Sequence, residues 1–198
     1  QLFRAAQDQC QRSADIMAHP RQKVRLGGAR LLLLADAQLQ PAVGAIQPGH
    51  VHGHEYEEQQ RDYQFLVKWD NPEIPDLLVD ESAPLGEDAG PSPSRLLALA
   101  VANCLSASLM FALRKFKNQP EPLKATVTGH LVRNEKNRLR VGRIDIDISM
   151  GKQAIELEHL QRVLAQFEDF CVVKESVRDG IDIRVTVRDS AGEIVKQP

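Results

Sequence analysis

The stretch GPSPSRLLALAVANCLSASLMFALRKFK, residues 90–117, decides the fold that this sequence predicts. It opens on a turn, because proline fixes φ and excludes a helix before it, and the serines can cap the first free N–H groups of a helix. Between Arg95 and Arg114 there is no charge, and apolar side chains fall on every side of a helical wheel. A helix that is apolar all round is buried all round. We therefore expect a buried central helix with a thiol, Cys104, in its middle.

Composition excludes several classes of function. The chain has 198 residues, which fits one domain of ordinary size with an added arm. The net charge of −2 provides no basic field for nucleic acid, and an aromatic content of 5% provides few platforms for stacked bases. No apolar run reaches the roughly 18 residues of a membrane span without a polar interruption, since Asn103, Ser106 and Ser108 interrupt the central helix. We expect neither a nucleic acid nor a membrane as partner.

The cysteines point to a reducing compartment. There are three, Cys10, Cys104 and Cys171, and a small odd number is not the disulfide framework of a secreted protein. The apolar run at residues 31–35 is too short for a signal peptide and is interrupted by Asp36. We expect a cytoplasmic protein.

Residues 1–60 carry the weakest pattern and are predicted to be an N-terminal extension outside the domain at 61–198. Within the extension, His50, His52 and His54 alternate in GHVHGHEYEE. They form either a metal site or a solvated polar loop. We favour the loop because no distant ligand is evident and flexible histidine tracts bind metal weakly. We expect no metal and no cofactor.

Strands flank the central helix on both sides. Residues 63–69 alternate as a half-buried strand, and a second short strand covers 77–79. After the helix, residues 124–132 and 139–150 form a strand pair, and the apolar face of the second strand changes near Gly142, which predicts a bulge.

The last third of the chain predicts one helix and one strand. Residues 154–170 form an amphipathic helix with Cys171 at or just past its end, and residues 181–187 form the last strand. The resulting order, β-β-α-β-β-α-β, predicts an α+β fold in which a mainly antiparallel sheet packs on the central helix. One sheet covers only one side of that helix, so we expect a second subunit to cover the rest.

The two later cysteines have two interpretations. Both fall on core-facing positions, so they are either a peroxidatic and resolving pair or ordinary small hydrophobes. Spacing alone favours packing, because core thiols are common.

The segments GPSPSRLLALAVANCLSASL at 90–109 and FEDFCVVKESVRDGIDIRVTV at 167–187 resemble the OsmC/Ohr family of osmotically induced and organic-hydroperoxide-resistance proteins. The shared pattern is a Gly-x-x-Pro turn, a buried helix with a cysteine, and a later helix that ends at a second cysteine before a strand. The resemblance implies an intertwined homodimer with the site at the subunit interface, a peroxide substrate and an external dithiol reductant. It assigns attack on the peroxide to Cys104 and resolution to Cys171.

The sequence departs from the family at its charged residues. Family peroxidases place a glutamate ten positions before the first cysteine, where this chain has Ser94, and an arginine in the turn after the first strand, which reads WDNP here. Arg95 is the nearest replacement cation, with Asp80 or Glu81 to orient it; alternatively, all three are solvated. Two functions therefore stay open: a thiol peroxidase, and a non-catalytic OsmC-like stress or ligand-binding protein with structural thiols.

Overall fold

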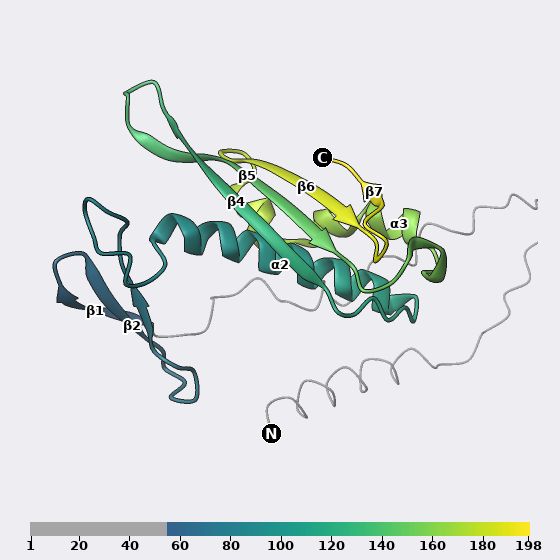
Figure 1. Cartoon of the computed structure of the whole chain (residues 1–198), viewed down its shortest axis with the longest axis horizontal. Coiled ribbons are helices and arrows are strands. Elements are labelled where there is room, and N and C mark those ends of the chain that lie inside the picture. The colour runs from purple at the N-terminus through teal and green to yellow at the C-terminus, as the bar shows by residue number, and fades with distance from the viewer. Residues whose placement is uncertain (1–54) are drawn as a thin grey trace, which may run out of the picture. The chain divides into compact units, whose positions relative to one another are not determined.

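The computed structural model describes residues 55–198, and Figure 1 shows how their helices and strands are arranged. A three-stranded antiparallel sheet contains β1 (Tyr56–Arg61), β2 (Gln64–Lys68) and β3 (Leu77–Val79). A four-stranded sheet has the order β4 (Lys124–Arg133), β5 (Leu139–Ser149), β6 (Asp182–Arg188) and β7 (Ile194–Lys196). Only β5 and β6 run parallel. The α+β fold with a mainly antiparallel sheet on a central helix is confirmed.

The central helix α2 (Pro93–Lys115) begins where the sequence predicts. Ser92 is the N-cap residue in extended conformation, and Pro93 occupies the first turn, where its missing N–H costs nothing. The buried side of α2 repeats every three to four residues, as an amphipathic helix requires; it consists of Ala98, Val101, Ala102, Leu105, Leu109 and Leu113.

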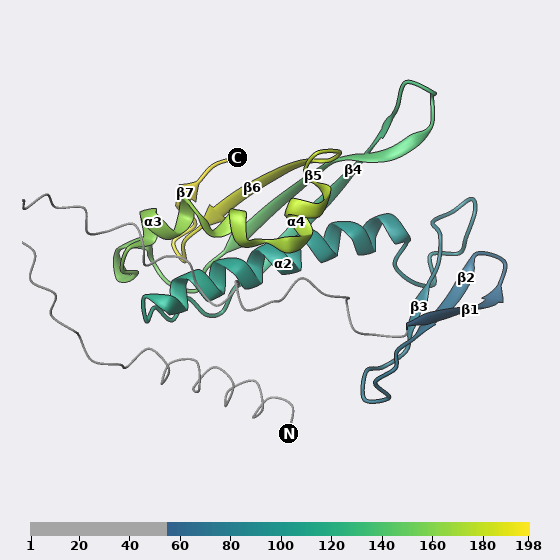
Figure 2. The ribbon, with the colours of Figure 1, turned by 180° about the vertical axis from the view of Figure 1, so that it is seen from behind.

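The core lies between α2 and one face of the four-stranded sheet. That face presents Ile144, Ile146 and Ile148 of β5 with Val185 and Val187 of β6, all buried in one cluster with the apolar side of α2. Figure 2 shows α3 (Leu160–Leu164) and α4 (Val172–Val177) on the same side of the sheet as α2. Their apolar residues close the core around Phe167, which is fully buried.

The predicted bulge is present at Gly142. His130 pairs with Arg143, but Leu131 pairs with Val141, so Gly142 is the extra residue of β5. A Cβ atom at this position would collide with the side chain of Val132. Only a residue without a side chain fits at this bulge, and the bulge moves the apolar side chains of β5 from one face of the strand to the other.

The single helix predicted at 154–170 is wrong. The segment forms two 3-10 turns, η2 (Ala154–Glu156) and η3 (Phe167–Phe170), with the short helix α3 between them. His159 adopts a left-handed conformation at the start of α3, with φ of 56°. Just before it, the Asn118 side chain accepts the Glu158 N–H at 2.8 Å and donates to the Glu158 carbonyl at 2.9 Å. These two hydrogen bonds to a distant residue hold the chain at Glu158 in a bend, although the apolar spacing of residues 154–170 would also fit one continuous helix.

Two strands were not predicted. All residues of β1 are exposed, so they show no apolar alternation, and β1 begins inside the range 1–60 that the sequence assigns to an extension. The strand β7 was expected to be a tail. The histidines at 50, 52 and 54 and Cys10 lie outside the described residues.

Among residues 55–198, one face of α2 has no cover. Leu99 is 55% exposed and Phe111 is 41% exposed. The helix is long and apolar enough to cross a membrane by length and composition, a test that core helices of soluble proteins also pass. Its opposite face is buried against the four-stranded sheet and the segment from α3 to α4, as expected of a core helix.

Candidate functional site

The fold brings the two described cysteines together. Cys104 lies on α2 between its buried and its exposed face, and Cys171 lies at the junction of η3 and α4. Both thiols are free, and both belong to or pack against the same core cluster. The side chain of Cys104 is also close enough to that of Cys171 to raise its pKa. Residues distant in the sequence thus form one pair.

Cys171 is a fully buried thiol in a closely bonded turn. Its N–H donates to the Glu168 carbonyl at 3.1 Å, and its Sγ accepts the Lys174 N–H at 3.3 Å. Burial, followed by the interaction with Cys104, raises the pKa of Cys171 to about 12, although the Lys174 N–H acts in the opposite direction. Cys171 is therefore protonated at neutral pH, and a protonated thiol is a poor nucleophile.

Cys104 is the accessible member of the pair. It is half-buried, whereas Cys171 has no exposed surface. Its helical neighbours Asn103 and Ala107 are exposed, so the uncovered side of α2 leads to the thiol. The two thiols thus differ in exposure: Cys104 can be reached from solvent, and Cys171 cannot.

Arg95 does not meet Cys104 within the chain. It is 64% exposed and pairs with Asp88 at 3.7 Å. Nine positions of α-helix separate it from Cys104, which corresponds to about 13 Å along the axis and about half a turn around it. The acid that pairs with its guanidinium is Asp88, and not Asp80 or Glu81.

Asp80 holds the loop that leads into α2. It is buried, and its carboxylate accepts the N–H groups of Glu81 at 2.8 Å and of Glu87 and Ala89 at 3.0 Å. Burial acts to raise the pKa of Asp80, but these backbone hydrogen bonds outweigh it and lower the pKa. Glu81 contributes its backbone carbonyl to Asp88. These two acids therefore shape the loop rather than contact a thiol.

A pocket of about 240 Å³ lies between the start of α2 and the hairpin of β4 and β5. Three serines and Arg95 form its polar part, and the Oγ atoms of Ser92 and Ser94 are 3.0 Å apart. Its apolar wall comes from Val127, Leu131 and Val141 together with Ala98. The sequence did not indicate this pocket, because the hairpin side chains reach α2 only in the folded chain.

An ion cluster lies next to Cys171. The Glu168 carboxylate pairs with Lys174 Nζ at 3.0 Å and with Lys196 Nζ at 2.9 Å, and the three side chains are only 13–23% exposed. Nothing in the spacing of these residues predicts the cluster, because Lys196 comes from β7.

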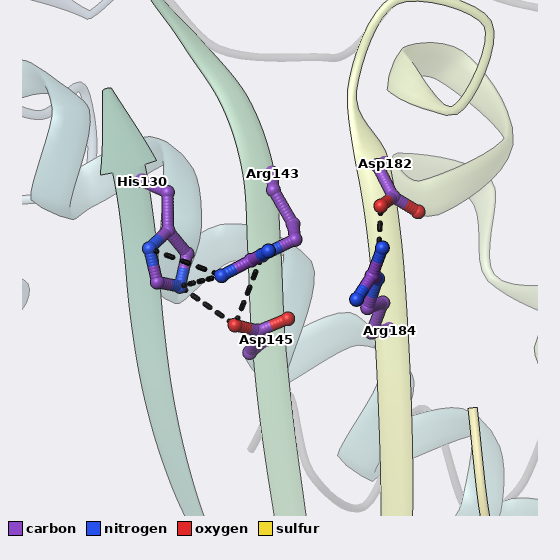
Figure 3. Close-up of polar contacts among 5 residues, drawn as sticks. All are labelled: His130, Arg143, Asp145, Asp182 and Arg184. Carbon is purple, nitrogen blue, oxygen red and sulfur yellow. Dashed lines mark hydrogen bonds and ion pairs between the residues drawn. The ribbon is translucent and has the colours of Figure 1, made fainter. Parts of the chain in front are cut away.

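The outer face of the four-stranded sheet carries a separate polar network, which Figure 3 shows. His130 Nε2 lies 2.6 Å from Asp145 Oδ2, which also accepts Arg143 Nε at 3.1 Å, while Arg184 pairs with Asp182. These residues alternate with core residues along their strands, so they point away from α2 and from both thiols. The contact of His130 with Asp145 joins β4 to β5, whereas each arginine–aspartate pair lies within one strand.

A family model described as OsmC-like protein matches residues 86–186. The matched range is just over half of the chain and contains both Cys104 and Cys171. The chain belongs to the OsmC-like protein family.

Solved structures share the fold of this OsmC-like protein. One of them is a protein from Psychrobacter arcticus 273-4 that is named for an osmotic stress induced and detoxification response. Its TM-score is 0.61 at 17% identity, and the match covers 72% of this chain and 100% of that one. An organic hydroperoxide resistance protein from Elizabethkingia anophelis has a TM-score of 0.59 at 16% identity, with 72% and 99% covered.

OhrB of Bacillus subtilis, an organic hydroperoxide resistance protein, has a TM-score of 0.53 at 16% identity, with 69% and 98% covered. No curated protein matches the sequence. At these identities the solved structures show that the OsmC-like chain contains the whole fold of its neighbours.

Proposed function

We propose that this OsmC-like protein is a thiol-dependent peroxidase that reduces organic or hydrogen peroxides through Cys104 and Cys171. One observation carries the proposal: the half-buried thiol of Cys104 interacts with the fully buried thiol of Cys171, so the two sulfurs lie side by side. Structural neighbours named as organic hydroperoxide resistance proteins support the same chemistry.

The proposed first step uses Cys104 as the nucleophile. Its thiolate sulfur attacks one peroxide oxygen and the O–O bond breaks, so the sulfur is oxidised to a sulfenic acid and the alkoxide takes a proton to leave as an alcohol. Cys104 suits this step because it is the thiol that a peroxide can reach.

The proposed second step uses Cys171 as the resolving thiol. Because Cys171 is protonated, its proton passes to the leaving hydroxyl as its sulfur attacks the Cys104 sulfur. The S–S bond forms, the S–O bond breaks, and water leaves. An external dithiol then reduces the disulfide and is itself oxidised. A reducing compartment such as the cytoplasm, which keeps thiols free, suits this cycle.

The proposed working form is a homodimer. A second copy would cover the face of α2 that carries Leu99 and Phe111, because isologous contacts bury the same apolar patch on both subunits. Arg95 lies on the wrong side of α2 to serve Cys104 of its own chain. We therefore propose that Arg95 acts on the partner's thiol across the interface, and that Glu81 supports it indirectly, because its carbonyl accepts the N–H of Asp88, the ion-pair partner of Arg95.

The test counts free thiols after treatment with cumene hydroperoxide. The wild type is expected to lose the two thiols of the pair, Cys104→Ser to lose neither of them, and Cys171→Ser to stop at a sulfenic acid that dimedone traps. Unchanged thiols in the wild-type protein contradict the proposal.

The exposed guanidinium of Arg95 favours one alternative, a non-catalytic ligand-binding protein. In that case the pocket at the start of α2 holds an apolar ligand, and the thiols only pack. Native mass spectrometry that finds a copurified lipid, together with inert thiols, selects this function.

A further inference from the structure

Among the ion pairs of residues 55–198, those of Glu168 with Lys174 and Lys196 have the least exposed side chains. They lie beside Cys171, the buried thiol. The Glu168 carboxylate has both oxygens occupied, Oε2 by Lys174 and Oε1 by Lys196. Removing Glu168 would leave two partly buried lysine charges without their partner, so the carboxylate restricts where the three side chains can lie.

The same residues also hold Cys171 through the backbone. The Glu168 carbonyl accepts the Cys171 N–H, and the Lys174 N–H donates to Cys171 Sγ. The side-chain pair of Glu168 and Lys174 therefore bridges the turn whose centre is Cys171.

The helix that follows cannot supply this restraint alone. α4 has six residues, which is shorter than an isolated helix needs to be stable. None of its residues is fully buried, and Val172 is 58% exposed. The position of Cys171 therefore depends on contacts outside α4, and Lys196 connects the turn to the four-stranded sheet through β7.

We propose that Glu168, with Lys174 and Lys196, is a positioning residue that sets the approach of Cys171 to Cys104 and so controls disulfide formation. This inference rests on the proposed peroxidase function. The ion pairs and hydrogen bonds of Glu168 involve no sulfur atom, so we expect its loss to leave the attack of Cys104 on peroxide unchanged. It acts on the second step, in which a displacement of about 1 Å can cost on the order of 100-fold in rate.

The kinetic test compares Glu168→Gln with Glu121→Gln in the full chain. Glu121 also pairs with a basic side chain, that of Arg114, but on the exposed surface, so its variant is a matched control. After one equivalent of cumene hydroperoxide, dimedone trapping measures sulfenic acid and thiol counting measures disulfide. We expect Glu168→Gln to slow disulfide formation by about tenfold or more while the first step keeps its wild-type rate, and Glu121→Gln to change neither.

The second measurement is the reduction potential of the thiol pair in dithiol redox buffers, which needs no peroxide. A tenfold loss of effective concentration makes the potential about 30 mV less negative. Lys196→Gln, which removes only the β7 contact, is expected to shift it in the same direction by less, and it replaces Glu168→Gln if that variant does not fold.

The outcomes separate the two proposals. A wild type that forms no disulfide with peroxide, but whose potential shifts in Glu168→Gln, ends the peroxidase proposal and keeps the positioning role in thiol pairing. A wild type that forms the disulfide, with a Glu168→Gln variant of unchanged potential and unchanged rates, overturns the positioning role. Equal slowing of both steps also overturns it.

Discussion

The middle and the start of α2 differ in how much of the predicted site a single chain assembles. At the middle, apolar packing brings Cys104 and Cys171 together. At the start, Arg95 stays exposed beside Asp88 and reaches neither thiol. The difference teaches that burial of apolar surface is sufficient to pair the thiols, whereas the predicted cation stays at the surface of the chain, where its partner is Asp88.

The largest expected difference is in thiol reactivity. Because its pKa is raised to about 12, Cys171 in the folded protein should react with iodoacetamide at pH 8 at least about 100-fold more slowly than Cys171 in denaturant. Peptide mapping by mass spectrometry measures both rates. Cys104 in the same sample is the internal control and should be alkylated first; faster alkylation of Cys171 would remove the distinction between the two thiols.

The two faces of α2 provide the next test. Leu105 is fully buried, so Leu105→Ala should lower the free energy of unfolding by about 2–5 kcal/mol. Leu99 is 55% exposed, so Leu99→Ala should change the unfolding of the monomer by less than about 0.5 kcal/mol.

If α2 forms the dimer interface, Leu99→Ala instead weakens association, which sedimentation at several concentrations measures. Equal dissociation constants for the wild type and Leu99→Ala would place the interface elsewhere.

A pH titration gives a smaller effect with a defined sign. The folded-state pKa of Cys171 is raised above its unfolded value of about 9, so the stability it contributes is complete below pH 9 and is lost as pH rises toward 12. Between pH 8 and pH 10 the wild type should lose about 1 kcal/mol more than Cys171→Ala in urea unfolding. Parallel curves for the two proteins would show that Cys171 ionises normally.

The smallest effect is expected at Arg95. Its exposed ion pair with Asp88 contributes about 0–1 kcal/mol, so Arg95→Ala should keep the wild-type unfolding curve. Peroxide reduction by the same variant then tests the role across the interface. A loss of rate with unchanged stability supports a partner-supplied cation, and a wild-type rate restricts the site to the thiol pair.

The parts of the fold that were predicted correctly are those with a strong apolar pattern. The helix at 93–115 and the strand pair β4–β5 with its bulge at Gly142 follow from it directly. The strand β1 escaped prediction because every residue in it is exposed, so only its hydrogen bonds to β2 reveal it. The break at His159 depends on Asn118, which lies about forty positions away in the chain.

By itself, the amino-acid sequence determined the central helix, the five strands β2 to β6 and the presence of two thiols at core-facing positions, because apolar periodicity is a local property that packing then satisfies. Only the tertiary structure decided that Cys171 is buried beside Cys104, that Arg95 lies on another side of α2, and that Glu168 joins Lys174 to Lys196. Pairings of this kind depend on distances between residues far apart in the chain, and those distances exist only after the core has formed.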